Sequence, residues 1–292
     1  MIEIPARFAA SQRGFGGQAF LDALPERIET FLARWRLSVD GPAMHGVAAL
    51  VLPVRRADGA PAVLKLQAVD GETEGEPAAL RAWGGDGAVR LLDHDAATGT
   101  MLLERLSPRD LNGVQDVVAG TRVVGELLVR LNAVPAPSGM RSLGGIAARM
   151  LEGVPRAVRA LADERERRLV EDCAAAVREV AGEPGDRLLH WDLHFENVLT
   201  RGDGPGAAWV AIDPKPLRGD PGYELMPALR NRIGEGRLRE RFDVLVDVLG
   251  LDRERARAWT LGRVLESSLW AVAAGDRLPG ECVEIGAVLR GR

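Results

Sequence analysis

Two short apolar segments with a turn signal between them limit how the first third of this chain can fold. The segments are VAALVLPVRR (residues 47–56) and APAVLKLQ (residues 60–67), and Ala57-Asp58-Gly59 joins them. An Asp-Gly pair between two apolar runs is typical of a β-hairpin. Side chains alternate between the two faces of a strand, so Lys65 and Leu64 point to opposite sides. We therefore expect an antiparallel sheet here, with Lys65 on one face of it.

Two helices and two more strands are expected around this hairpin. Residues 24–37 carry large apolar side chains at helical spacing. Residues 72–83 also have a helical pattern, with Pro77 tolerable only in the first turn. Two apolar runs, at residues 88–92 and 100–106, predict strands on either side of a short turn.

From about residue 107 the pattern becomes mainly helical. Long helical patterns cover residues 111–134 and 144–181, and most of the chain after Glu224 is helical in character as well. One further hairpin is expected at residues 197–213, where the turn RGDGPG separates NVLT from AAWVAID. In that hairpin the second strand is expected to end at Asp213.

A small sheet followed by many helices predicts an α+β fold. We expect an N-terminal lobe at residues 1–105, built from a small antiparallel sheet with one or two helices. A mainly helical C-terminal lobe is expected at residues 106–292. The length of 292 residues and the hydrophobic content of 46% suit a globular protein with an ample core.

Charge and hydropathy exclude several classes of protein. The net charge of −4 gives no electrostatic support for nucleic-acid binding. The sequence holds no apolar run of about eighteen residues, so no membrane span is expected. Because the first residues include Glu3 and Arg7 and form no apolar stretch, we expect no secretory signal and a cytoplasmic location. We further expect a monomer or a weak dimer.

The strip LLHWDLHFENVLT (residues 188–200) concentrates polar chemistry between leucines. Its His190, Asp192 and His194 alternate, and with Asp213 they could hold a metal as in a hydrolase. The same strip could instead position a hydroxyl and a nucleotide's metal for phosphoryl transfer. Few histidines are present to build a zinc site, because the chain has 4 in all.

Phosphoryl transfer needs a cation on the nucleotide phosphates and an acid to orient that cation. Only two of the 38 basic residues are lysines, Lys65 and Lys215, so a lysine is a marked choice in this chain. Lys65 on its strand is the candidate cation, and Glu76 in the next helix is its candidate partner. Glu72 and Glu74 compete for that role, and Lys215 can also be an ordinary surface residue.

The remaining requirements fall on the strip and on the strand after it. Asp192 can accept the proton of the acceptor hydroxyl. Asn197 and Asp213 can offer oxygens to Mg²⁺, which takes few protein ligands and keeps its waters and phosphates.

These residues carry a resemblance to a known family. HWDLHFENVL resembles the H-x-D-x-x-x-x-N catalytic loop of protein kinases, and more closely the HGDLHxxN form of aminoglycoside phosphotransferases. VLKL resembles the strand lysine motif, and IDPKP resembles the metal-aspartate segment. The chain from about residue 20 to its end is similar to the streptomycin 6-kinase and hydroxyurea kinase branch. The resemblance implies a two-lobed protein-kinase-like fold, ATP and Mg²⁺ as cofactors, and a small-molecule acceptor.

The resemblance also implies positions for the nucleotide. Adenine would contact the backbone C=O of Glu104 and N–H of Leu106. The loop over the phosphates would lie in GPAMHGVAALV, where Gly46 can contact phosphate or belong to an ordinary turn. His194 can donate to the γ-phosphate or have only a structural role. A protein without turnover, a pseudokinase, is a further possibility, which the intact motif residues disfavour.

Departures from the family pattern concern the acceptor side. Trp191 replaces the glycine of the commoner HGD form, and His190 is expected to hold the loop backbone. Glu224 stands where relatives usually have aspartate and is expected to brace the loop.

The acceptor follows from the family branch and from chain length. After Asp213 the chain soon becomes helical, without a long activation segment, which favours a small molecule over a protein. The branch implies streptomycin, whose guanidinium groups would bind carboxylates; hydroxyurea, another aminoglycoside or a metabolite would fit the catalytic residues equally well. The candidate substrate contacts in the C-terminal lobe are Glu196, Glu224, Glu235, Asp243, Glu266 and Trp270.

Overall fold

The computed structural model describes residues 2–14 and 17–291. The chain divides into two compact units, Met1–Ser107 and Pro108–Arg292. This division falls two residues beyond the boundary predicted from the change of pattern. Among the described helices, none is both long enough and apolar enough to cross a membrane.

The first unit is built on an antiparallel sheet in the order β1-β3-β4-β6-β5, with β2 paired to β3. The strands are β1 (Ser38–Val39), β2 (Met44–His45), β3 (Ala49–Arg55), β4 (Pro61–Gln67), β5 (Leu91–Asp95) and β6 (Thr100–Glu104). The predicted β3–β4 hairpin is confirmed, with Leu52 opposite Leu64. Its turn contains Gly59 at φ +80°, a conformation that glycine adopts without steric cost.

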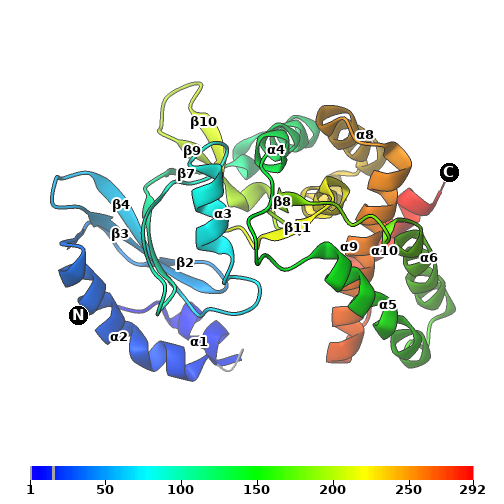
Figure 1. The fold of residues 1–292 in the computed structure, drawn as a ribbon, viewed down its shortest axis with the longest axis horizontal. Coiled ribbons are helices and arrows are strands. Elements are labelled where there is room, and N and C mark those ends of the chain that lie inside the picture. The colour runs from blue at the N-terminus through cyan, green and yellow to red at the C-terminus, as the bar shows by residue number, and fades with distance from the viewer. Residues whose placement is uncertain (1, 15–16, 292) are drawn as a thin grey trace. The chain divides into compact units, whose positions relative to one another are not determined.

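Three helices complete the first unit: α1 (Ala6–Gly14), α2 (Gln18–Arg34) and α3 (Glu76–Trp83). The expectation of one or two helices was too low, because α1 has only nine residues and buries only Phe8 and Gln12, which gives little apolar periodicity. Helices α1 and α2 cover one face of the sheet, where Phe8 and Ile28 join Leu64 in a single buried cluster (Figure 1). The opposite face carries Lys65, whose side chain meets α3. Leu64 and Lys65 thus lie on opposite faces, as the alternation predicted.

Several boundaries in this unit differ from the prediction. Helix α2 runs over Gln18–Arg34, whereas the helical pattern was expected at residues 24–37. Helix α3 begins at Glu76 and not at residue 72, because the Asp70 carboxylate accepts hydrogen bonds from the backbone N–H groups of Glu72 and Thr73 and holds them in a turn. Pro77 accordingly lies in the first turn of the helix. Strand β5 begins at Leu91, three residues later than expected.

The second unit is mainly helical. Its α-helices are α4 (Val117–Asn132), α5 (Leu143–Ala160), α6 (Glu164–Val180), α7 (Leu225–Arg230), α8 (Leu238–Leu249), α9 (Arg253–Ala274) and α10 (Gly280–Arg290). Helix α9 packs against α5, α6 and α10, and α4 packs against α8 (Figure 1). The predicted helical segment 144–181 is two helices, because Asp163 caps α6 by accepting from Arg165 N–H and Glu166 N–H. Segment 111–134 also breaks, at the cap Asp116.

Short strands and 3-10 helices carry the chain between these α-helices. The second hairpin is confirmed as β9 (Val198–Arg201) and β10 (Ala208–Ala211), and β7 (Ser107–Asp110) pairs with β9. Its exposed turn includes Gly202, Gly204 and Gly206, around which a Cβ would meet open space. The 3-10 helices are η1 (Leu111–Gly113), η2 (Phe195–Asn197), η3 (Pro221–Glu224) and η4 (Ile233–Glu235).

A two-stranded sheet frames the polar strip. Strands β8 (Arg187–Leu189) and β11 (Leu217–Gly219) pair antiparallel, with Leu189 opposite Leu217. The strip continues from β8, and β11 begins two residues after Lys215. A Cβ at Gly219 would come within 2.8 Å of Leu143 Cβ, so α5 packs closely on this sheet.

Candidate active site

In the first unit, Lys65 and Glu76 form a buried ion pair. Lys65 Nζ lies 2.6 Å from Glu76 Oε1 and 2.8 Å from Oε2, and Gln67 Nε2 donates to Oε2 at 2.7 Å. The two charged side chains are only 6% and 1% exposed. Glu76 also opens α3, where the helix dipole favours a negative charge. Of the three candidate glutamates, Glu76 receives this ammonium, so the ion is held at a fixed place on the sheet.

The other predicted nucleotide contacts of this unit lie at strand ends. Gly46 N–H donates to Ala49 O at 3.0 Å, so Gly46 belongs to the tight β2–β3 turn. Glu104 ends β6, and its carboxylate accepts from Arg90 N–H at 2.8 Å. Leu106 follows in a half-buried, irregular stretch. Nucleotide binding by these three residues remains a prediction.

In the second unit, Glu224 braces the strip, as predicted. Its carboxylate accepts from His190 N–H at 3.0 Å, from Trp191 N–H at 3.1 Å and from Asn132 Nδ2 at 2.7 Å. The residue is completely buried. Burial raises the pKa of Glu224 to about 7, against the opposing effect of these donors. Its predicted contact with substrate stays a prediction that this burial disfavours.

His190 connects the strip to the residue that follows β10. Its Nε2 donates to Ile212 O at 2.9 Å, and its Nδ1 accepts from Asp192 N–H at 3.4 Å. Burial lowers the pKa of His190 to about 4, so the ring is neutral at pH 7. Both ring nitrogens of His190 thus form hydrogen bonds with backbone groups, as expected. These bonds weigh against a role for His190 as a metal ligand.

Asp192, His194 and Asn197 are connected through the strip's own backbone. Asp192 O accepts from His194 N–H at 3.1 Å and from Asn197 Nδ2 at 2.9 Å. Because the amide nitrogen of Asn197 is used in this way, its oxygen is the atom that this side chain could offer to a metal. His194 Nδ1 lies 3.7 Å from Glu196 Oε2, and burial lowers the pKa of His194.

The hairpin brings Asp213 next to Asn197. Ile212 N–H donates to Asn197 O at 2.9 Å, one step beyond the β9–β10 register. The prediction that the strand ends at Asp213 was wrong, because β10 ends at Ala211 and Asp213 takes a left-handed backbone with φ +56°. This turn directs the chain away from the sheet at the residue expected to bind metal.

Trp191 also has a left-handed backbone, with φ +71°. A Cβ makes this conformation sterically unfavourable, which explains why glycine suits the commoner form of the motif. The side chain is buried, and the guanidinium carbons of Arg263 and Arg141 lie 4.1 and 4.5 Å from its ring centre. The half-exposed Trp270 meets it edge-on at 6.0 Å. Cation–π contacts and burial stabilise the indole in this place.

Lys215 is a member of the site that the sequence did not assign. Its Nζ lies 3.3 Å from Asp192 Oδ2 and 5.7 Å from the centre of the Trp191 ring. Its rarity as one of two lysines was the available signal, but its partner lies far away in sequence.

The predicted substrate contacts have different surroundings. Glu266 is buried and accepts from Tyr223 Oη at 2.9 Å and from Arg263 Nη1, so its charge is already paired. Asp243 pairs with Arg253 at the surface. Glu196 is 69% exposed, and Trp270 is 49% exposed. Substrate binding by these residues remains a prediction, with Glu196 and Trp270 the more accessible.

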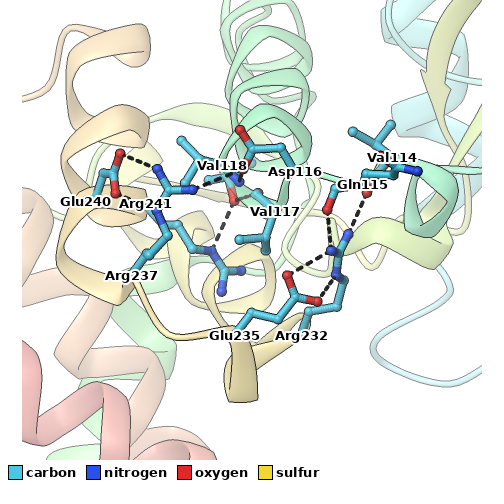
Figure 2. Close-up of polar contacts among 11 residues, drawn as sticks. Val114, Gln115, Asp116, Val117, Val118, Arg232, Glu235, Arg237, Glu240 and Arg241 are labelled. Carbon is cyan, nitrogen blue, oxygen red and sulfur yellow. Dashed lines mark hydrogen bonds and ion pairs between the residues drawn. The ribbon is translucent and has the colours of Figure 1, made fainter.

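Glu235 belongs to the connection between α7 and α8, which anchors the strip from outside. Arg232 pairs with Glu235 at 2.6 Å and donates to Val114 O and Gln115 O, both at 2.5 Å (Figure 2). The neighbouring Asn231 Oδ1 accepts from Phe195 N–H at 2.7 Å. The connection therefore holds the strip and the start of α4 together.

The donor set of the second unit suits a hard cation. Asn197 and Asp213 offer oxygen ligands, which Mg²⁺ prefers. In the described part of the chain, no group of three or more His, Cys, Asp or Glu side chains is arranged to hold a metal. This arrangement differs from a zinc hydrolase site, and it is compatible with a cation carried largely by phosphate oxygens and water.

Comparison with solved structures shows the fold class. The structure is similar to a thermostable aminoglycoside phosphotransferase APH(4)-Ia solved with ADP and hygromycin B, with a TM-score of 0.65 and 16% identity over 90% of this chain and 97% of that one. It is also similar to a choline/ethanolamine kinase family protein from Mesorhizobium loti, with a TM-score of 0.64 and 17% identity over 87% and 88%. The predicted α+β, kinase-like fold class is confirmed.

Sequence comparison gives the family within that class. Residues 34–275 match the family model of aminoglycoside/hydroxyurea antibiotic resistance kinases, and the chain belongs to that family. It is 57% identical to a hydroxyurea phosphotransferase of Kitasatospora aureofaciens, over all of this chain and 87% of that protein. It is 52% identical to a streptomycin 6-kinase of Streptomyces glaucescens, over all of this chain and 98% of that one. The resemblance stated from the motifs is confirmed.

Proposed function

We propose that this protein transfers the γ-phosphoryl group of ATP to a hydroxyl of a small molecule. The observation that carries the proposal is the set of hydrogen bonds that joins Asn197 to Asp192 and to Ile212, the residue before Asp213. The Asn197 amide donates to Asp192 O at 2.9 Å, and Ile212 N–H donates to Asn197 O. Family membership as a kinase supports the same reaction.

In this proposal, Lys65 binds the α- and β-phosphates. Its bidentate pairing with Glu76 fixes the ammonium, which lowers the ordering cost of gripping phosphate. Backbone groups of Glu104 and Leu106 receive the adenine, and Gly46 lies near the phosphates. Asn197 and Asp213 would hold Mg²⁺, which neutralises phosphate charge when it is bound.

Asp192 is the proposed acceptor of the hydroxyl proton. Phosphoryl transfer depends mainly on positioning and on charge stabilisation, so the proton moves late. The frame of Glu224 and His190 supports such a role, because it holds the backbone N–H groups of Trp191 and of Asp192 itself. His194 would donate to the transferred group, with its lowered pKa favouring the neutral ring.

The proposed acceptor is an aminoglycoside such as streptomycin, and the streptomycin 6-kinase relative supports it. Exposed Glu196 and Trp270 are the accessible candidates for contact with a guanidinium-bearing substrate. Hydroxyurea is the second candidate. One observation favours it: the Asp192 carboxylate is already paired with the Lys215 ammonium, which leaves less negative charge there to attract a cationic acceptor.

An ATP-consumption assay with mass spectrometry of the product tests the proposal. Streptomycin, other aminoglycosides and hydroxyurea are offered separately, and one of them should gain a phosphoryl group. Asp192→Ala should lower turnover by about 10²–10⁴-fold while ATP still binds. Asp203→Ala, at the exposed β9–β10 turn, is the matched control and should keep full activity.

Two results would contradict these assignments. Near-normal turnover by Asp192→Ala would remove Asp192 as the proton acceptor. ATP binding without transfer to any of these acceptors would favour a non-catalytic nucleotide-binding protein, and acceptor hydrolysis that needs zinc and no ATP would favour a hydrolase.

A further inference from the structure

Lys215 is presented by an unusually stiff piece of backbone. It lies between Pro214 and Pro216, and proline fixes its own φ while restricting the residue before it. Both backbone polar groups of Lys215 are also bonded: its N–H donates to His190 O at 3.1 Å, and its C=O accepts from Arg141 Nη2 at 2.8 Å. The stem of this side chain therefore starts from a fixed point attached to the strip.

The ammonium of Lys215 reaches the carboxylate proposed as the proton acceptor. Nζ lies 3.3 Å from Asp192 Oδ2, and the two side chains are 31% and 16% exposed. The Trp191 ring, 5.7 Å away, gives the ammonium a flat wall with which cations interact favourably. The pair is thus shielded on one side and open to solvent on the other.

We infer that Lys215 is a positioning residue for phosphoryl transfer, which acts by holding the Asp192 carboxylate in its reactive orientation. This inference rests on the proposed function. The ion pair engages Oδ2, and in the productive complex Oδ1 receives the acceptor hydroxyl. An aspartate side chain turns about two bonds, so a partner on one oxygen fixes the direction of the other.

This role differs from that of the other lysine. Lys65 is paired with Glu76 in the first unit and is almost completely buried. Lys215 is paired with the proposed proton acceptor itself, from the segment that follows the proposed metal ligand Asp213. Removal of Lys215 should therefore affect the transfer step and leave ATP affinity unchanged.

A double-mutant cycle tests whether Lys215 acts through Asp192. We expect Lys215→Met to lower kcat about 10–100-fold, part of the effect of removing a general base, with KM for ATP within about twofold. In an Asp192→Asn background the same substitution should change kcat by less than about twofold, because the group it positions is already lost. Lys215→Arg should recover part of the activity, and Arg218→Met, an exposed cation three residues further, is the control.

Lysine NMR tests the pair without any reaction. Protein labelled with [ε-¹³C]lysine has two lysine signals, because the sequence contains only Lys65 and Lys215. Lys215→Arg removes one signal and so assigns both. Asp192→Asn should shift the Lys215 signal and leave the Lys65 signal in place.

The outcomes separate this inference from the proposed function. An active protein whose kcat is unchanged by Lys215→Met, or additive losses in the cycle, would overturn the role of Lys215 alone. An unshifted Lys215 signal in Asp192→Asn would overturn it as well. If the unaltered protein transfers phosphate to no acceptor, the proposed function fails and the role of Lys215 fails with it, even if the NMR result confirms the pair.

Discussion

Replacement of Trp191 by alanine and, separately, by glycine isolates the cost of its left-handed backbone. Both variants lose the same buried indole and its contacts with Arg263 and Arg141. Truncation of a buried tryptophan costs about 3–5 kcal/mol in the free energy of unfolding. The two variants therefore differ mainly in what a Cβ costs at φ +71°.

The magnitude follows from two opposing effects. A Cβ in the left-handed region costs about 1–2 kcal/mol. Glycine loses about 0.4–1 kcal/mol relative to alanine, because its unfolded chain has more freedom to lose. Trp191→Gly should consequently be more stable than Trp191→Ala by about 1 kcal/mol, the reverse of the usual order.

Trp259 provides the matched comparison. It is also fully buried, but it lies inside helix α9, where glycine costs about 1 kcal/mol relative to alanine. Trp259→Ala should therefore be more stable than Trp259→Gly. Urea denaturation of the four variants, followed by tryptophan fluorescence and circular dichroism, measures both differences. If Trp191→Ala is as stable as Trp191→Gly, a Cβ has no conformational cost at this position and the reasoning is refuted.

Three further perturbations test other parts of the structure. Lys65→Met leaves Glu76 buried without its ammonium and should lower the free energy of unfolding by about 3–5 kcal/mol, measured by urea denaturation. Burial raises the pKa of Glu224 from 4.5 to about 7, so the folded chain binds the proton of this carboxyl more tightly than the unfolded chain. The protonated carboxyl therefore contributes up to about 3 kcal/mol to the free energy of unfolding. This contribution is complete below pH 4.5 and is lost as pH rises through 7. Unfolding free energies measured at pH 5 and pH 8 for the wild type and Glu224→Gln should show that the variant has the weaker dependence. Gly219→Ala puts a Cβ 2.8 Å from Leu143 Cβ and should cost about 1–3 kcal/mol, seen as a lower Tm.

Two of these perturbations have a control elsewhere in the chain. Arg34→Met breaks an ion pair whose arginine is 57% exposed and should cost less than about 1 kcal/mol. Gly204→Ala meets open space and should leave Tm nearly unchanged. A loss in Lys65→Met no larger than that in Arg34→Met would contradict the buried pair. An equal pH dependence in Glu224→Gln and the wild type would assign that dependence to other groups.

Local signals predicted those parts of the fold that depend on neighbouring residues. The Asp58-Gly59 turn and strand alternation were sufficient for the β3–β4 hairpin. The Gly-rich turn was sufficient for the β9–β10 hairpin, and with it the approach of Asn197 to Asp213. In both cases the two strands are adjacent in sequence, so turn chemistry sets their register.

Features that depend on distant partners were not predictable in this way. Strands β8 and β11 are three residues each, too short for a periodic signal, and they pair across the whole strip. The Lys215–Asp192 contact needs the same pairing. One feature that was not predicted has a signal in the sequence, the ion pair between Arg263 and Glu266. Arg263 precedes Glu266 by three residues, a spacing that places two side chains next to each other on a helix. The cap Asp163 was likewise visible as the residue that divides α5 from α6.

The β9–β10 turn is a suitable place to insert a reporter into this enzyme. Its glycines at 202, 204 and 206 are exposed and meet open space, so the tip of the hairpin is the kind of place where inserted sequence is tolerated. A small fluorescent reporter or affinity peptide spliced between Gly202 and Gly206 would be carried by the two strands that lead to Asn197 and Asp213. Such a fusion would place the reporter at the far end of the hairpin from Asn197 and Asp213, without a label on any residue of the proposed site.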